Sequence, residues 1–126
     1  MTEPDSSFVI AVIDDDRSVL RSLEYLLESA DYAVRLFTSA MALLDSGDLA
    51  QIDCLISDID MPGMDGFELL GFVNAARPGL PVILITGYPE RLERFRLSGE
   101  SNPRFFTKPF HGPQLLNAVS DALRGS

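Results

Sequence analysis

Four segments of this chain carry side chains able to bind a divalent cation or a phosphoryl group, and each follows an apolar run. Carboxylates brought within a few ångströms of one another resist ionising together, and a hard cation such as Mg²⁺ removes the conflict because it takes oxygen ligands. A hydroxyl and an ammonium beside the cation suit the remaining oxygens of a phosphoryl group. The segments are Asp14-Asp15-Asp16, Ser57-Asp58-Ile59-Asp60, Thr86-Gly87 and Lys108-Pro109. If the fold brings them together, they make a Mg²⁺-phosphoryl site.

Each of these residues also has an ordinary structural interpretation. Asp16 is a suitable N-cap for the helix expected after it, because its carboxylate can accept from backbone N–H groups that have no helical partner. Thr86 matches a common kind of strand-end residue, and a single lysine such as Lys108 is commonly solvated. The site prediction therefore depends on all four segments reaching one edge of the fold.

Short apolar runs alternate with stretches of helical period along the chain, and this alternation predicts the fold class. The expected buried strands are Phe8–Ile13, Ala33–Phe37, Asp53–Ser57, Pro81–Thr86 and Arg104–Thr107. Because each helical crossover returns the chain to the same end of the sheet, the strands should be parallel. The sequence thus predicts an α/β, doubly wound, five-stranded sheet with helices on both faces. Ligands bind such sheets off the carboxyl ends of the strands, where all four segments fall.

The expected helices have recognisable starts and stops. The first follows Asp16, a short one follows Ser39, and a third begins at Phe67 and stops before a proline at position 78. A weak helix is expected over 90–97. The last should have Gly112 as its N-cap and Pro113 as its first helical residue.

Composition and charge argue against several classes of function. With a net charge of −9, the chain lacks the clustered basic residues that bind a phosphate backbone, so no direct nucleic-acid binding is expected. No apolar run approaches the roughly 18 residues of a membrane span, and no secretory signal pattern is present, so no membrane contact is expected. The single cysteine, Cys54, allows no internal disulfide and fits a reducing, cytoplasmic compartment. We expect its side chain to fill the core.

The four segments also resemble, as motifs, the receiver domain of two-component response regulators. The motifs are Val12-Ile-Asp-Asp-Asp16, Ile56-Ser-Asp-Ile-Asp-Met-Pro-Gly-Met-Asp-Gly66, Ile83-Leu-Ile-Thr86 and Phe105-Phe-Thr-Lys-Pro-Phe110. The resemblance spans roughly Phe8 to Leu123 and implies a flavodoxin-like sheet with the strand order 2-1-3-4-5. It divides the chain into an N-terminal tail, 1–7, a receiver domain, 8–124, and a C-terminal tail, 125–126.

The resemblance implies a phosphoacceptor and a metal site. Asp58 is expected to receive the phosphoryl group from a partner. Mg²⁺ is expected to bind Asp15 directly, Asp14 through water, and Asp58 itself. The backbone carbonyl of Asp60 is expected to be a further ligand.

The resemblance also implies a conformational switch. Thr86 should bond the phosphoryl group and move toward it, and the aromatic ring of Phe105 should move with it. Lys108 should pair with the phosphoryl oxygens and precede a cis proline, Pro109. Phosphorylation would then shift the population of the face built from the fourth helix, the fifth strand and the fifth helix.

Two features depart from the family pattern. The segment 87–103 lacks the usual small residues, which affects the expected output face but not the phosphorylation site. Asp60 adds a carboxylate two residues after the acceptor. It could repel phosphoryl donors or an attacking hydroxide, or coordinate the metal, and we expect it to alter the lifetime of the phosphorylated form.

Two other functions are compatible with some of these residues. Asp58-Ile-Asp60, Thr86 and Lys108 also resemble the Asp-x-Asp, Thr and Lys set of haloacid-dehalogenase-like phosphatases, with Asp58 as nucleophile. In that family the Asp-x-Asp lies on the first strand and the acidic pair follows the lysine, so the order here favours a receiver. An unphosphorylated docking module is the other alternative, and the complete set of site residues argues against it. The domain itself is not expected to be an enzyme beyond self-catalysed phosphotransfer and dephosphorylation.

The resemblance implies protein partners. A sensor histidine kinase or phosphotransfer protein should phosphorylate the domain, and an unknown downstream protein or output domain should respond to it. The sequence is compatible with a stand-alone receiver or with the N-terminal part of a longer regulator. A homodimer through the output face is a further possibility.

Overall fold

Five parallel strands form one sheet in the order β2-β1-β3-β4-β5 in the computed structural model, which describes residues 8–90 and 104–124. The strands are β1 (Val9–Ile13), β2 (Ala33–Phe37), β3 (Cys54–Asp58), β4 (Val82–Thr86) and β5 (Arg104–Thr107). The helices are α1 (Arg17–Glu28), α2 (Ala40–Ser46), the 3-10 turn η2 (Asp48–Gln51), α3 (Gly66–Ala76) and α5 (Gly112–Leu123). The predicted fold class and strand order are confirmed.

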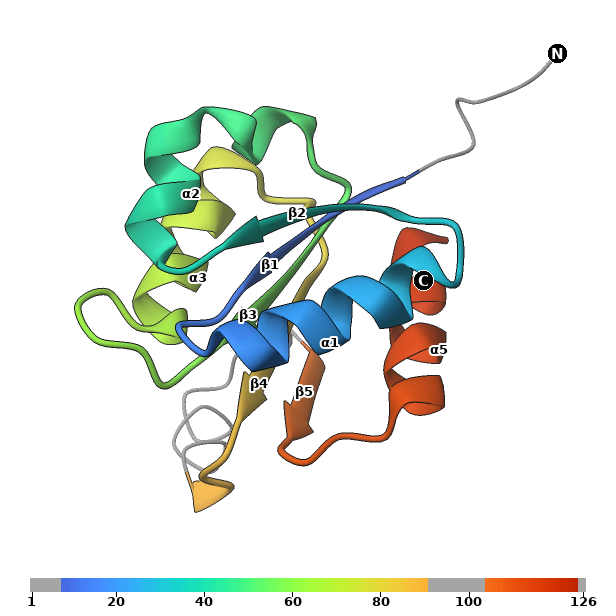
Figure 1. Ribbon diagram of the computed structural model, residues 1–126. Helices are drawn as coiled ribbons and strands as arrows, with labels where there is room; N and C mark the ends of the chain where they lie inside the picture. The colour runs from blue at the N-terminus through green and yellow to red at the C-terminus, as the bar shows by residue number, and fades with distance from the viewer. Residues whose placement is uncertain (1–7, 91–103, 125–126) are drawn as a thin grey trace, which may run out of the picture.

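Helices cover both faces of the sheet: α2 and α3 lie on one side, and α1 and α5 on the other (Figure 1). Side chains alternate along each central strand, so neighbouring residues enter different cores. In β1, Ala11 and Ile13 face the α2–α3 layer, whereas Ile10 and Val12 face the α1–α5 layer. Burial on both faces explains why these strands are apolar throughout.

The helix starts follow from local hydrogen bonds. Asp16 caps α1, accepting from the Ser18 backbone N–H at 2.9 Å, and Ser39 caps α2 through Ala42 N–H at 3.1 Å. Both caps were predicted. The predicted start of α5 is wrong by one residue, because the N-cap is His111 and the helix begins at Gly112. Pro113 still fits, since the first helical turn leaves several N–H groups unbonded and loses nothing to a proline there.

Other boundaries differ from the predictions by a residue at most. The strand predicted to begin at Phe8 begins at Val9, the strand predicted to begin at Asp53 begins at Cys54, and β4 begins after Pro81. Asp58 is itself the last residue of β3. Residues 91–97 of the helix predicted over 90–97, and most of the atypical segment 87–103, lie outside the described residues.

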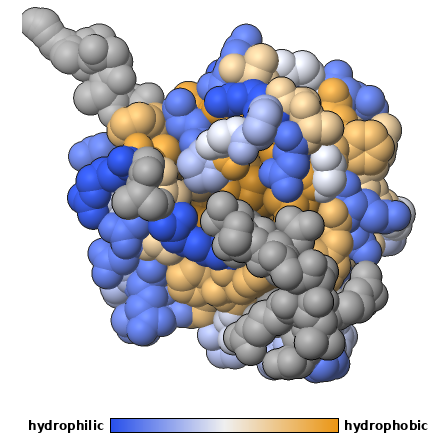
Figure 2. Space-filling view, turned by 180° about the vertical axis from the view of Figure 1, so that it is seen from behind, coloured by the Kyte–Doolittle hydropathy of each residue, from blue (hydrophilic) through white to orange (hydrophobic). Residues whose placement is uncertain are grey.

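Cys54 fills the core of β3 as predicted: its side chain is buried, and burial raises the pKa of its thiol to about 12. No helix in the two described ranges, 8–90 and 104–124, is long and apolar enough to cross a membrane. On the face opposite to that of Figure 1, hydrophobic residues gather near the centre and hydrophilic ones occupy much of the rim (Figure 2).

Candidate phosphoryl and metal site

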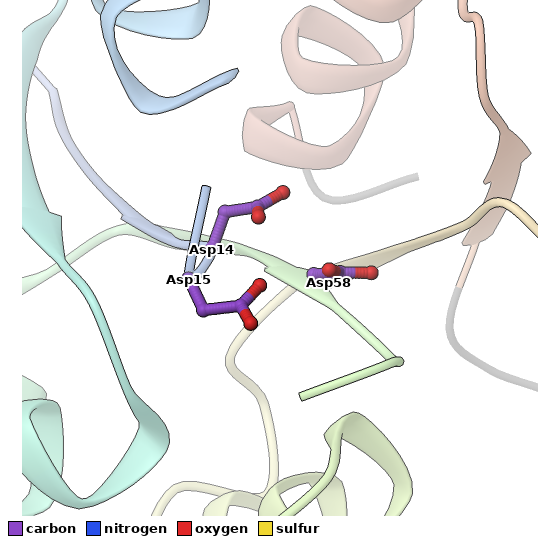
Figure 3. Close-up of side chains that lie close together, drawn as sticks. All are labelled: Asp14, Asp15 and Asp58. Atoms are coloured by element: carbon purple, nitrogen blue, oxygen red, sulfur yellow. The ribbon is translucent and has the colours of Figure 1, made fainter. Parts of the chain in front are cut away.

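Three aspartates meet at the carboxyl ends of β1 and β3. Asp14 and Asp15 follow β1, Asp58 ends β3, and one carboxylate oxygen from each lies within 4.8 Å of the others (Figure 3). Asp14 and Asp58 are buried, at 2% and 4% exposure, whereas Asp15 is exposed. The parallel pairing of Ile13 with Ser57 brings these strand ends side by side. The cluster therefore opens to solvent through Asp15.

Local hydrogen bonds separate the roles of the consecutive aspartates. Oδ1 of Asp14 accepts from the Asp16 backbone N–H at 2.9 Å, which turns the chain sharply after β1. The carboxylate of Asp16 is used as the helix cap, and its hydrogen bonds to Ser18 lower its pKa. Asp16 therefore has a structural role as the helix cap, whereas the carboxylates of Asp14 and Asp15 belong to the acidic cluster.

Lys108 brings a cation to the buried side of the cluster. Its Nζ lies 3.1 Å from Oδ2 of Asp14 and 3.4 Å from Oδ2 of Asp58. Its backbone N–H donates to the Thr86 carbonyl at 2.8 Å, and the following peptide bond to Pro109 is cis, as expected. The short strand β5 thus places Lys108 beside Asp58, although the two residues are 50 positions apart in the sequence.

Burial and mutual repulsion control protonation in the cluster. Desolvation, followed by repulsion from Asp14, raises the pKa of Asp58 to about 6. Desolvation also raises the pKa of Asp14, although hydrogen bonds from Asp16 and Lys108 oppose the shift. For Lys108, burial disfavours the charged form, but the Asp58 and Asp14 carboxylates outweigh it and the pKa is raised. The lysine thus stays cationic while the carboxylates resist full ionisation.

Thr86 and Asp60 form a second polar contact beside the cluster. The Thr86 hydroxyl is buried and donates to Oδ2 of Asp60 at 2.6 Å, while the Tyr88 backbone N–H donates to that hydroxyl oxygen at 3.0 Å. The Asp60 backbone N–H in turn donates to Oδ1 of Asp58 at 3.2 Å. Asp60 therefore connects the hydroxyl that ends β4 to the carboxylate that ends β3.

Gly66 lets α3 approach the segment that follows β3. Its N–H donates to the Ile59 carbonyl at 3.0 Å. A Cβ on this residue would lie 2.8 Å from Ile59 Cα and 2.9 Å from the Asp58 carbonyl oxygen, so no larger residue fits without a backbone shift. Asp65 and Glu68 form a reciprocal capping box at the same helix start. The position of Asp58 and the two residues after it thus depends on the start of α3.

Comparison with known proteins identifies the family. Residues 10–120 match the family described as the response regulator receiver domain. This chain belongs to that family. The transcriptional regulatory protein FixJ of Bradyrhizobium diazoefficiens is 37% identical to it over 118 residues, which make up 91% of this chain and 56% of that protein. FixJ of Azorhizobium caulinodans is 39% identical over 120 residues, covering 93% of this chain and 56% of that protein.

Solved structures agree with this assignment. A CheY-like response regulator receiver domain protein from Methanospirillum hungatei superposes with a TM-score of 0.82 at 29% identity, covering 94% of this chain and 95% of that one. Full-length FixJ from B. japonicum superposes with a TM-score of 0.80 at 35% identity, covering 93% of this chain and 58% of that one. The chain thus spans about half the length of the curated relatives that it matches.

The family assignment settles the class of function. The chain is a receiver domain of two-component response regulators, whose signalling is driven by phosphorylation, and the phosphatase alternative is not favoured. Receiver domains are in general not classical enzymes. They bind Mg²⁺ at an acidic pocket and interact with histidine kinases and output domains.

The acidic cluster of this receiver fits a small hard cation. Carboxylate oxygens from Asp14, Asp15 and Asp58 are the donors that Mg²⁺ prefers, and the exposure of Asp15 leaves room for the waters that Mg²⁺ retains. The carboxylate of Asp60 is not among the three that meet within 4.8 Å, and its Oδ2 accepts from Thr86 instead. Metal coordination by the Asp60 side chain, one of three options raised by the sequence, is therefore not what this geometry favours.

Most of the residues predicted for this site do meet in the fold, and one contact was not predicted. The structure brings Asp14, Asp15, Asp58 and Lys108 together, with Thr86 at the end of the neighbouring strand. Phe105 pairs with Leu84 in the register of β4 and β5, and packs partly buried against the α2–α3 core. The Asp60–Thr86 hydrogen bond was not foreseen. The sequence signal for it was that Thr86 ends one strand and Asp60 lies just after its neighbour, which does not specify where their side chains meet.

Proposed function

We propose that Asp58 is the phosphoacceptor of this receiver. The observation that carries the proposal is the placement of one buried carboxylate between two further carboxylates and an ammonium group. Asp15, the exposed member of the cluster, gives a metal-bound phosphoryl donor a solvent-facing side from which to approach. We propose that Asp14, Asp15, Asp58 and the backbone carbonyl of Asp60 hold Mg²⁺.

The proposed reaction is a single phosphoryl transfer that the domain itself promotes. A carboxylate oxygen of Asp58 forms a bond to phosphorus, the bond from phosphorus to the donor atom breaks, and that atom leaves with the electron pair. With a pKa of about 6, Asp58 is mostly ionised at pH 7.5 and therefore nucleophilic. When bound, Mg²⁺ would neutralise charge on the phosphoryl oxygens. The ammonium of Lys108, 3.4 Å from Asp58, is placed to pair with one of these oxygens. Hydrolysis of the resulting acyl phosphate would return Asp58 to the free carboxylate.

The proposed readout uses Thr86 and Phe105. Thr86 would give its hydroxyl to the phosphoryl group, and Phe105 on the adjacent strand would change its packing against the α2–α3 core in response. A ligand that binds one arrangement better shifts the population toward it. Phosphorylation would in this way alter the surface around β5 and α5, where a homodimer or a downstream partner could form.

The partner proposals follow from the relatives. We propose a histidine kinase or phosphotransfer protein as the phosphodonor in the cytoplasm, and residues 8–124 as the receiver unit. The two FixJ relatives are named transcriptional regulatory proteins. Control of transcription is therefore the output we propose. Any DNA contact would be made by an output domain rather than by this acidic chain, whose net charge is −9.

The proposal is tested by intact-mass measurement after incubation with acetyl phosphate and Mg²⁺. The wild-type protein should gain one phosphoryl group, and Asp58→Asn should gain none. Omission of Mg²⁺, or addition of EDTA, should also prevent the gain. A phosphoryl group retained in Asp58→Asn would disprove the assignment.

Asp45→Asn is the matched control, because Asp45 is exposed on α2, away from the cluster. This variant should be phosphorylated like the wild type. The phosphatase alternative predicts a different result. Each protein would release many phosphate ions in the time that one acyl phosphate on Asp58 takes to decay.

A further inference from the structure

The single proton of the Thr86 hydroxyl already has a short acceptor in this structure, and the Tyr88 carbonyl, at 3.4 Å, is a longer alternative. The hydroxyl donates to Oδ2 of Asp60 at 2.6 Å and accepts from the Tyr88 backbone N–H at 3.0 Å. A hydroxyl has one proton to donate. While Thr86 gives that proton to Asp60, it cannot also give it to a phosphoryl oxygen on Asp58.

The acceptor is a carboxylate, which makes the contact strong for a hydrogen bond. Bonds from a hydroxyl to an ionised acceptor are short, at about 2.5 to 2.7 Å, and roughly twice as strong as neutral ones. The Thr86 side of the bond is buried, and the Asp60 backbone is fixed to Asp58 by its own N–H at 3.2 Å. Thr86 is therefore held by β4, which it ends, and Asp60 by its backbone hydrogen bond to the last residue of β3.

We infer that Asp60 holds Thr86 in the resting position, so that phosphoryl capture by Thr86 requires this hydrogen bond to break. Asp60 is thus a positioning residue that opposes activation and sets the balance between the resting and phosphorylated arrangements. The inference rests on the proposed function, in which Thr86 bonds the phosphoryl group. Asp60 would then act on signalling through its hydrogen bond to Thr86. It would not act only by binding the metal or by repelling the phosphoryl group.

Simple charge repulsion is the competing explanation, because Asp60 would also repel an anionic group on Asp58. The two explanations differ in their dependence on the Thr86 hydroxyl. Repulsion acts whether or not residue 86 carries a hydroxyl, whereas the hydrogen bond needs it. Thr86→Val removes the hydroxyl while keeping a branched side chain of similar size. Comparing Asp60→Ala in both backgrounds therefore isolates the hydrogen bond.

The experiment measures binding of beryllium trifluoride, an analogue of the phosphoryl group, at saturating Mg²⁺ and pH 7.5 by isothermal titration calorimetry. Asp60→Ala should bind it about tenfold more tightly than the wild type, the effect of losing about one hydrogen bond to a charged group. In the Thr86→Val background, Asp60→Ala should change the affinity less than about twofold. Equal tightening in both backgrounds, or none in either, would overturn the inference.

A second measurement reports on the position of Thr86 directly. Because the Tyr88 N–H donates to the Thr86 hydroxyl oxygen, its amide resonance senses that hydroxyl. In Asp60→Ala without ligand, this resonance should move toward its position in the wild-type complex with beryllium trifluoride. An unchanged resonance would contradict the inference.

Failure of the inference can be told from failure of the proposed function. If the wild-type protein binds beryllium trifluoride no better than Asp58→Asn does, both are overturned. If only the wild type binds, while the Asp60 variants behave as repulsion predicts, the receiver site stands and the Asp60 inference alone is lost.

Discussion

Asp58 is buried, yet its proposed role as a nucleophile needs the ionised carboxylate. Burial raises the free energy of that ionised form. Its carboxylate is 4% exposed and faces Asp14, so ionisation is disfavoured and its pKa is raised to about 6. Lys108 relieves only part of this conflict, because it is shared between Asp14 and Asp58. A bound cation would relieve the rest. The residue that carries function is thus expected to reduce the stability of the metal-free protein.

Asp58→Asn should raise the free energy of unfolding of the metal-free protein by about 1 to 3 kcal/mol at pH 7.5, since one pKa unit corresponds to about 1.4 kcal/mol. The native pKa of about 6 exceeds the ordinary aspartate value of 3.8, so native Asp58 holds its proton more tightly. The stability from this preference is present below pH 4 and is lost as the pH rises through about 6. The gain from the substitution should therefore shrink between pH 7.5 and pH 4.5.

Urea unfolding in EDTA at several pH values measures this effect. Asp45→Asn, on exposed α2 surface, should change the free energy of unfolding little at any of these pH values. A gain in Asp58→Asn that does not vary with pH would contradict the assignment of the raised pKa to Asp58.

The element that positions the acceptor is the start of α3. The capping box of Asp65 and Glu68 fixes the first turn, and Gly66 allows that turn to contact the backbone of Asp58 and Ile59. A glycine is needed here because of this close approach, not because of an unusual backbone angle. The geometry of the acceptor and of the Asp60 carbonyl therefore depends on one helix terminus.

Gly66→Ala should lower the free energy of unfolding by about 1 to 3 kcal/mol, because the new Cβ would be 2.8 Å from Ile59 Cα and force a backbone shift. Mg²⁺ affinity should fall several-fold at the same time, since the shift displaces the segment that ends in the Asp60 carbonyl. Urea unfolding and Mg²⁺ titration followed by NMR measure the two effects.

Gly71→Ala is the control within the same helix, because a Cβ added at Gly71 would meet no neighbouring residue within 4 Å outside its own helix backbone. This substitution should leave Mg²⁺ affinity unchanged and stabilise the helix by up to about 1 kcal/mol. Equal Mg²⁺ affinity in both alanine variants would show that the close approach at Gly66 does not position the site.

The whole molecule is a sheet shared by two hydrophobic cores. Leu43 of α2 lies in one core and Leu27 of α1 in the other, and both side chains are fully buried. The same strands line both cores, since alternate residues of β1, β3 and β4 face opposite sides. Loss of packing on one side should therefore weaken the sheet that supports the other.

Leu27→Ala and Leu43→Ala should each lower the free energy of unfolding by about 2 to 5 kcal/mol, through lost burial and the cavity left behind. Each variant should still unfold in a single transition with an unchanged dependence on urea concentration. Far-UV circular dichroism and tyrosine fluorescence, followed together, test this. Separate transitions for the two probes would show that the two layers unfold independently.

The sequence by itself determined where most helices and strands lie and which polar side chains stand at the carboxyl ends of the strands. Periodicity located all five strands and the starts of α1, α2, α3 and α5 to within about a residue, because burial on one or two faces imposes that pattern on the chain. The short turn η2 (Asp48–Gln51) was not predicted. The rule for parallel sheets then assigned Asp14, Asp15, Asp58, Thr86 and Lys108 to one edge. Family motifs added the strand order and the role of each residue, which periodicity alone does not contain.

Only the tertiary structure decided which of these side chains touch. Asp60 and Thr86 are 26 residues apart, and their 2.6 Å contact depends on the path of the chain after β3 and on the pairing of β3 with β4. A side chain in a loop has no fixed periodicity, so nothing local to Asp60 indicates that it meets Thr86 rather than a metal. The sequence likewise does not specify that Lys108 contacts both Asp14 and Asp58. Contacts between strand ends are set by register and loop geometry, which exist only in the folded molecule.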